Sequence, residues 1–172
     1  MGSPFFSEMG GEHMNDTVVT ETGHTPAKRV SIVSVKMVRE SSLLYPQRRI
    51  RMASDAAGLF RQFLDATDRE QFLLLCLNTK NEPTAIHTVS VGSLDASIVH
   101  PRETFKIAIL SNSASIIVAH SHPSGDPTPS REDIEVTKRL QEAGELLGIT
   151  VLDHIVVGVE GAYVSLKEKG YM

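Results

Sequence analysis

Residues 115–133 read Ser115-Ile116-Ile117-Val118-Ala119-His120-Ser121-His122-Pro123-Ser124-Gly125-Asp126-Pro127-Thr128-Pro129-Ser130-Arg131-Glu132-Asp133. The segment opens with an apolar, mostly β-branched run that ends at a histidine, a pattern typical of a strand buried on both faces. A loop dense in proline and glycine follows, and Ser130 stands where a helix N-cap is expected. The segment therefore predicts a strand, a short loop and a helix.

The same signals continue in both directions along the chain. Continuous or alternating apolar runs predict strands at 30–38, 72–77, 85–91, 149–159 and 162–166, with the second and third of these joined as a hairpin. We expect one helix capped by Ser54 and another opened by Pro101. The expected core-facing stripes are Ala56, Leu59, Phe60, Phe63 and Leu64 in the Ser54 helix, and Ile134, Thr137, Leu140, Ala143 and Leu147 in the helix that ends at Gly148. This order predicts an α/β (α+β) fold with a single mixed central sheet flanked by helices.

Composition narrows the class of protein. The chain has 172 residues and a formal net charge of -4, with 17 Lys and Arg against 21 Asp and Glu. Such a balance argues against direct, non-specific nucleic-acid binding, which needs an excess of cations. The single cysteine, Cys76, lies in an apolar run, so we expect a buried, inert thiol in a reducing compartment.

The N-terminal residues differ in composition from the rest of the chain. Residues 1–27 are polar and lack apolar periodicity, so they predict a flexible N-terminal tail followed by one domain over 28–172. No stretch reaches the ~18 apolar residues that a membrane span needs, and no signal-peptide pattern opens the chain. We expect a cytoplasmic protein without membrane partners.

Three side chains of the opening segment form a pattern of metal ligands. His120 and His122 are two residues apart in extended backbone, which places both rings on one side. Asp133 lies on the first turn of the next helix, and the loop can return it to the same point. Two imidazoles and one carboxylate leave a fourth position open, the mark of a catalytic zinc site. A competing interpretation is that Ser130 and Asp133 are simply a capping box.

Other polar residues favour less specific roles. Asp126 is a turn residue by its setting between Gly125 and Pro127. His154, at the start of an apolar run, is expected to be a buried, hydrogen-bonded histidine. His87 and His100 are expected on the surface or in packing contacts.

The stretch from His120 to Asp133 resembles the JAMM motif of the JAB/MPN metalloprotease superfamily, and more narrowly the RadC-like branch. The resemblance starts near Lys28, includes residues 35–42, 68–72, 99–103 and 152–158, and implies a cytidine-deaminase-like architecture. We expect a short form, because the helix-hairpin-helix segment that precedes this domain in full-length RadC proteins has no room in the 27-residue tail. A true zinc deaminase is excluded because its site needs a Cys-x-x-Cys pair.

The family implies a role for each matching residue. His120, His122 and Asp133 would hold one Zn²⁺ per chain, Ser130 would stabilise an oxyanion, and Glu70 would be the general base, with Glu103 as the alternative base. The implied function is a zinc metallopeptidase acting on peptide or isopeptide bonds of a protein substrate. The alternative is a catalytically silent MPN interaction module associated with DNA-repair or mobile-element proteins. An exposed edge strand could pair two copies into a homodimer.

Overall fold

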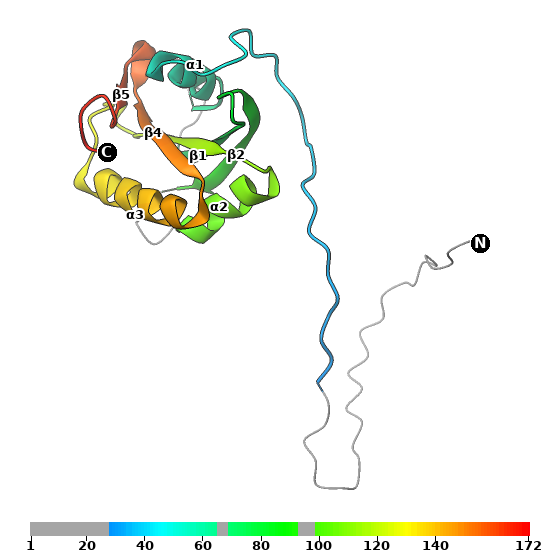
Figure 1. The fold of residues 1–172 in the computed structure, drawn as a ribbon. Coiled ribbons are helices and arrows are strands. Elements are labelled where there is room, and N and C mark those ends of the chain that lie inside the picture. Colours follow the sequence, from blue (N-terminus) through cyan, green and yellow to red (C-terminus); the bar gives the residue numbers. More distant parts are fainter. Residues whose placement is uncertain (1–27, 65–68, 93–98) are drawn as a thin grey trace, which may run out of the picture. The chain divides into compact units, whose positions relative to one another are not determined.

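The computed structural model describes residues 28–64, 69–92 and 99–172 and divides the chain into two units, 1–35 and 36–172. All helices and strands of the described residues lie in the second unit (Figure 1). They follow the order α1 (Ala53–Leu64), β1 (Gln71–Leu77), β2 (Pro83–Val91), α2 (Pro101–Leu110), β3 (Ser115–Ser121), α3 (Arg131–Leu147), β4 (Thr150–Val157), a 3₁₀ turn (Val159–Gly161) and β5 (Tyr163–Ser165). The predicted tail at 1–27 lies outside the described residues.

The strands form one mixed sheet in the order β2-β1-β3-β4-β5. Only β3 and β4 run parallel, and α3 supplies the crossover between them. β1 is antiparallel to both of its neighbours, and its register sets Phe72 opposite His120. The predicted α+β fold with a single mixed sheet is confirmed, including the hairpin of β1 and β2.

Helices cover both faces of the sheet, α1 on one side and α2 with α3 on the other. Successive side chains of a strand point to opposite faces, so β1 divides its apolar residues between two cores. Leu73, Leu75 and Leu77 pack with α1, whereas Phe72, Leu74 and Cys76 pack with α2 and α3. This two-sided burial explains why the strand is a continuous apolar run, and it confirms the buried thiol of Cys76.

The prediction of a strand at 30–38 is wrong. Residues 28–44 form neither helix nor strand, and side chains such as Val30 and Ile32 are exposed. The alternating pattern is present in the sequence, but a strand also needs a neighbour that pairs with its backbone.

Two details of the helices also differ from prediction. α1 begins at Ala53, before Ser54, and the Asp55 carboxylate accepts hydrogen bonds from the backbone N–H groups of Arg51 and Met52. The stripe of α3 is rotated, because Asp133 faces the sheet. Its buried side is Asp133, Val136, Thr137, Leu140 and Gly144, whereas Ile134 and Ala143 are half-buried and Leu147 is exposed.

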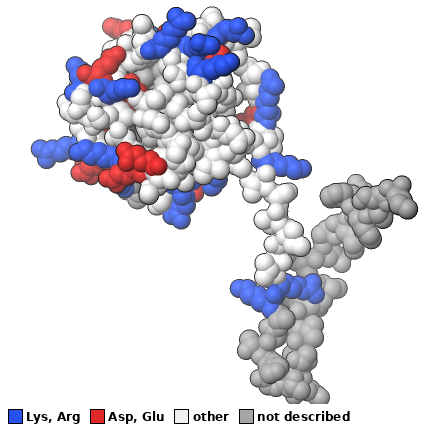
Figure 2. Space-filling view, in the orientation of Figure 1, with Lys and Arg blue, Asp and Glu red and all other residues white. Residues whose placement is uncertain are grey.

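The surface of the described residues carries charges of both signs. Figure 2 shows basic and acidic side chains interspersed on the visible face of the domain, around an uncharged centre. Within the described ranges, none of the helices combines the length and the apolar character that crossing a membrane requires.

Candidate metal centre

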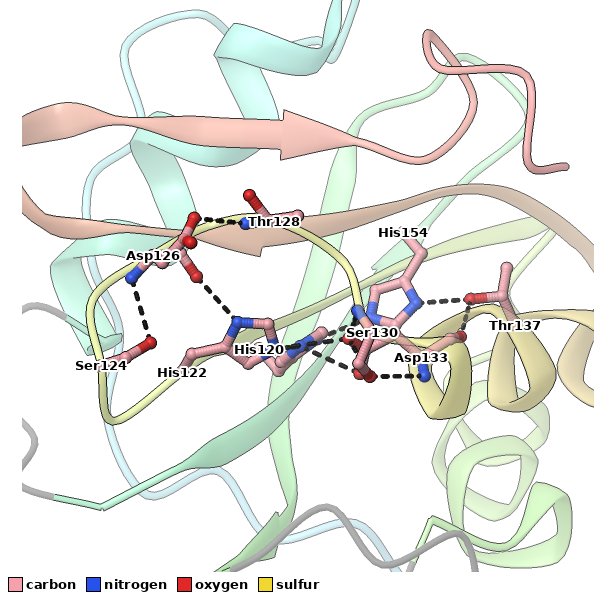
Figure 3. A network of polar contacts seen from close by, with 9 residues as sticks. All are labelled: His120, His122, Ser124, Asp126, Thr128, Ser130, Asp133, Thr137 and His154. Carbon is pink, nitrogen blue, oxygen red and sulfur yellow. Dashed lines mark hydrogen bonds and ion pairs between the residues drawn. The ribbon is translucent and has the colours of Figure 1, made fainter.

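The histidine pair lies where β3 runs out into the loop before α3. His120, near the end of β3, is fully buried and points to the face of the sheet that α3 covers. His122 follows one residue beyond the strand and is partly exposed. Their Nε2 atoms are 2.9 Å apart (Figure 3), as the two-residue spacing in extended backbone predicts.

Asp133 connects helix capping with the histidines. The Ser130 side chain accepts a hydrogen bond from the Asp133 N–H, and Asp133 Oδ2 accepts from the Ser130 N–H, so the capping box is present. Asp133 Oδ1 also lies 3.2 Å from His120 Nε2, and Oδ2 lies 3.3 Å from His122 Nε2. The capping box therefore aims the carboxylate at the histidines, and the two interpretations of this pattern are compatible.

Electrostatics reflect this close grouping. Burial by itself would raise the pKa of Asp133, but contacts with His120, His122 and Ser130 outweigh it and hold the pKa well below its usual range. The hydrogen bond with Asp133 raises the pKa of His122 despite partial desolvation of the ring. The site therefore favours the ionised form of the Asp133 carboxyl.

Glu70 joins the group from the neighbouring strand. It directly precedes β1, and the antiparallel register that pairs Phe72 with His120, continued by two residues, brings Glu70 opposite His122. Ligand atoms of Glu70, His120 and His122 all lie within 4.8 Å of one another. Glu103 is not in this group: it lies on the first turn of α2, exposed and bonded to Lys106 at 2.6 Å.

The donor set fits a zinc ion. Zinc binds imidazole nitrogen and carboxylate oxygen at ~2.0–2.1 Å, so neighbouring ligands of a tetrahedral site are about 3.3 Å apart. His120 Nε2 lies 2.9 Å from His122 Nε2 and 3.2 Å from Asp133 Oδ1, and His122 Nε2 lies 3.3 Å from Asp133 Oδ2, so each of these separations is close to that value. Asp133 Oδ2 is occupied by Ser130, so Oδ1 is the oxygen better placed to act as a ligand.

The loop between β3 and α3 fixes His122 from outside. His122 Nδ1 lies 2.7 Å from the carbonyl oxygen of Asp126, and a carbonyl can only accept, so Nδ1 carries the proton. The Asp126 side chain accepts from the Thr128 N–H, in agreement with its predicted turn role. Gly125 adopts a positive φ of 74° in the same loop. Metal-binding histidines commonly donate their second nitrogen in this way.

The sequence analysis did not predict that two residues, His154 and Thr137, lie directly behind the site. His154 of β4 is buried and hydrogen-bonded, as predicted, but its partner is His120, with Nε2 2.8 Å from His120 Nδ1. Thr137 of α3 contacts His154 Nδ1 at 2.6 Å. Thr137 lies four residues after Asp133, hence on the same face of the helix, which is the one sequence signal that could have suggested it.

A hollow of about 410 Å³ opens beside His122. Its walls come from the loop at 121–125, the chain at 157–160, Leu64 and Arg69. The lining combines apolar side chains with one positive and one negative residue, Arg69 and Glu160. Such a hollow can take part of a substrate next to the histidines.

Fold and site together define a class: a mixed-sheet domain with a histidine pair and carboxylates that can hold a metal. Comparison with known proteins agrees with it, since the model of the RadC-like JAB domain family matches residues 50–171. The chain therefore belongs to the RadC-like JAB domain family.

The chain is similar to several UPF0758 proteins. A UPF0758 protein of Desulforamulus reducens is 50% identical over 151 residues, covering 86% of this chain and 66% of the relative. One from Methanosarcina barkeri is 53% identical over 127 residues, covering 74% and 55%. One from Methanococcoides burtonii is 42% identical over 179 residues, covering 100% and 78%. The chain thus spans about half to two thirds of the length of the first two of these relatives and a larger part of the third.

Proposed function

We propose that this protein is a zinc-dependent hydrolase that cleaves peptide or isopeptide bonds of a protein substrate in the cytoplasm. One observation carries the proposal: Glu70, His120, His122 and Asp133 converge from three separate elements beside an open hollow. A purely structural role would not require two carboxylates around a histidine pair at the rim of a cavity. Membership of the JAB family supports the same chemistry.

One zinc ion per chain would be held by His120, His122 and Asp133. When bound at such a site, zinc acts as a Lewis acid towards water and a carbonyl oxygen. The chain itself supplies the proton chemistry. Glu70 lies beside His122 without belonging to the ligand set we propose, so its carboxylate takes a proton from water and delivers it to the leaving amine.

Ser130 is the proposed donor to the developing oxyanion. In the structure its hydroxyl donates to Asp133 Oδ2 at 2.7 Å, so the same proton holds the proposed metal ligand. Stabilising an oxyanion requires this hydrogen to turn towards the substrate. The Ser130 N–H remains bonded to Asp133 and keeps the carboxylate in place during that turn.

The hollow suggests how a polypeptide would lie. For an extended chain next to His122, Leu64 and Val159 would offer apolar contacts, and Arg69 and Glu160 would offer charged groups to its polar atoms. The volume of about 410 Å³ suits a short stretch of polypeptide.

The test combines metal content with hydrolysis. Purified wild type is expected to hold about one zinc per chain and to cleave members of a library of quenched fluorescent peptides and lysine-linked isopeptides. Glu70→Gln should keep zinc and lose turnover by about 100-fold or more. Glu103→Gln, a matched change at an exposed glutamate, should keep both.

Other outcomes would overturn the proposal. Wild type without zinc would remove its basis. Zinc-loaded protein that cleaves nothing in either library would favour the interaction module. Loss of turnover in Glu103→Gln but not in Glu70→Gln would transfer the role of base to α2.

A further inference from the structure

We propose that Thr137 and His154 are positioning residues that fix the ring of His120 with its proton on Nδ1, so that the Nε2 lone pair faces the metal position. This inference rests on the proposed zinc site. It concerns a chain of hydrogen bonds that runs from α3 through β4 to β3 behind that site (Figure 3).

The first step is the direction of the Thr137 hydroxyl. Thr137 Oγ1 lies 2.6 Å from the carbonyl oxygen of Asp133, and a carbonyl only accepts, so the single hydroxyl hydrogen points there. Thr137 Oγ1 also lies 2.6 Å from His154 Nδ1. Since the hydroxyl has no second hydrogen, it accepts in this contact, and His154 Nδ1 must carry a proton.

The second step is the charge of His154. Its ring is completely buried and packs edge-on against Phe72, with ring centroids 5.4 Å apart. A second proton would place a cation in this apolar setting, at a high desolvation cost. His154 Nε2 is then an acceptor.

The third step follows for His120. Its Nδ1 lies 2.8 Å from His154 Nε2, which accepts, so His120 Nδ1 donates. A neutral imidazole with a proton on Nδ1 has its lone pair on Nε2. That Nε2 is the atom 3.2 Å from Asp133 and 2.9 Å from His122 Nε2.

The two histidines therefore reach the same tautomer by different routes. His122 uses a loop carbonyl, that of Asp126, whereas His120 uses a buried relay that starts on α3 and reaches it through His154 of β4. The relay begins at the carbonyl of Asp133, the residue whose side chain is a proposed ligand. Displacement of α3 would consequently disturb both the carboxylate and the tautomer of His120.

The experiment removes the hydroxyl and then restores it. Thr137→Val keeps the shape of the side chain but allows His154 to move its proton to Nε2, which would drive the His120 proton to its own Nε2. Thr137→Ser retains the hydroxyl and is the matched control. Imidazole tautomers are assigned by long-range ¹H–¹⁵N NMR on the metal-free proteins, and zinc affinity is measured by competition with a chelator.

We expect metal-free wild type and Thr137→Ser to show His120 and His154 protonated on Nδ1. Thr137→Val should lose this pattern and bind zinc about 10- to 100-fold more weakly, the usual effect of removing an outer partner of a metal ligand. Wild type in which His120 Nδ1 carries no proton would overturn the inference, as would wild-type zinc affinity in folded Thr137→Val.

The NMR arm separates this inference from the proposed function, because it needs neither zinc nor substrate. A correct tautomer in a protein that binds no zinc would refute the metal site and leave the relay standing. If Thr137→Val fails to fold, the tautomer of His120 in wild type decides alone.

Discussion

Gly158 packs closely against the loop at 123–129, so a larger residue at position 158 would displace this loop without changing any proposed metal ligand. A Cβ at Gly158 would lie 2.7 Å from the carbonyl oxygen of Gly125 and 2.7 Å from Pro127 Cδ. The backbone there has φ -107° and ψ -177°, which alanine adopts without strain. Gly158→Ala is therefore a change of steric contact alone.

The size of the displacement follows from contact distances. Non-bonded heavy atoms prefer separations of ~3.5 Å, so the loop must retreat by about 0.6–1 Å. The Asp126 carbonyl lies in this loop, 2.7 Å from His122 Nδ1. A shift of that size takes the contact to the limit of a hydrogen bond or beyond it. We expect zinc affinity to fall about 10- to 100-fold and the free energy of unfolding to fall by about 1–3 kcal/mol.

Chelator competition measures the zinc affinity, and urea titration measures the free energy of unfolding. Gly58→Ala is the control, because a Cβ at Gly58, within α1, meets nothing within 4 Å. It should leave zinc affinity unchanged and add about 0.5–1 kcal/mol of stability through helix propensity. If Gly158→Ala binds zinc within twofold of wild type, the loop carbonyl does not hold His122 and the reasoning is refuted.

Three further variants test neighbouring contacts. Ser130→Ala removes an N-cap and a donor to Asp133, so urea titration should show a loss of about 1 kcal/mol, and wild-type stability would contradict the capping role. Gly144→Ala should lower the free energy of unfolding by about 1–3 kcal/mol in the same assay, because the new Cβ would lie 2.5 Å from the Ile149 carbonyl oxygen. This loss should exceed the gain from the higher helix propensity of alanine. A net gain in stability would show that α3 can move away from this carbonyl. Asp153→Ala should lower the thermal midpoint far more than Asp153→Asn, since the carboxylate accepts from two backbone N–H groups and the Ser165 hydroxyl; equal midpoints would mean that these donors find other acceptors.

Much of the fold could be predicted because burial leaves a strong trace in the sequence. β1 and β3 contain the uninterrupted apolar runs 72–77 and 116–119 because helices cover both faces of the sheet. The prediction of a strand at 30–38 was wrong because alternating β-branched residues show only that the segment can adopt extended backbone. A strand also needs a neighbouring strand that pairs with its backbone. That neighbour lies elsewhere in the sequence, so the residues at 30–38 do not indicate whether it exists.

Some contacts of the candidate site could likewise be predicted from local sequence, and others could not. Spacing placed His120, His122 and Asp133 together because extended backbone and a capped helix have fixed geometry. The relay through Thr137 and His154 could not be predicted, since it depends on which residues of α3 and β4 meet behind β3. The rotated face of α3 has a related cause: the capping box orients Asp133 inwards, and the apolar stripe follows from it.

The most direct test of the account is the location of zinc in crystals of the zinc-loaded protein, found by anomalous scattering at the zinc absorption edge. If these residues hold zinc as proposed, there will be one anomalous peak per chain, within ~2.0–2.2 Å of His120 Nε2, His122 Nε2 and one oxygen of Asp133. Glu70 should lie beside the peak without binding the ion. An absent peak, or a peak at other residues, would contradict the central claim.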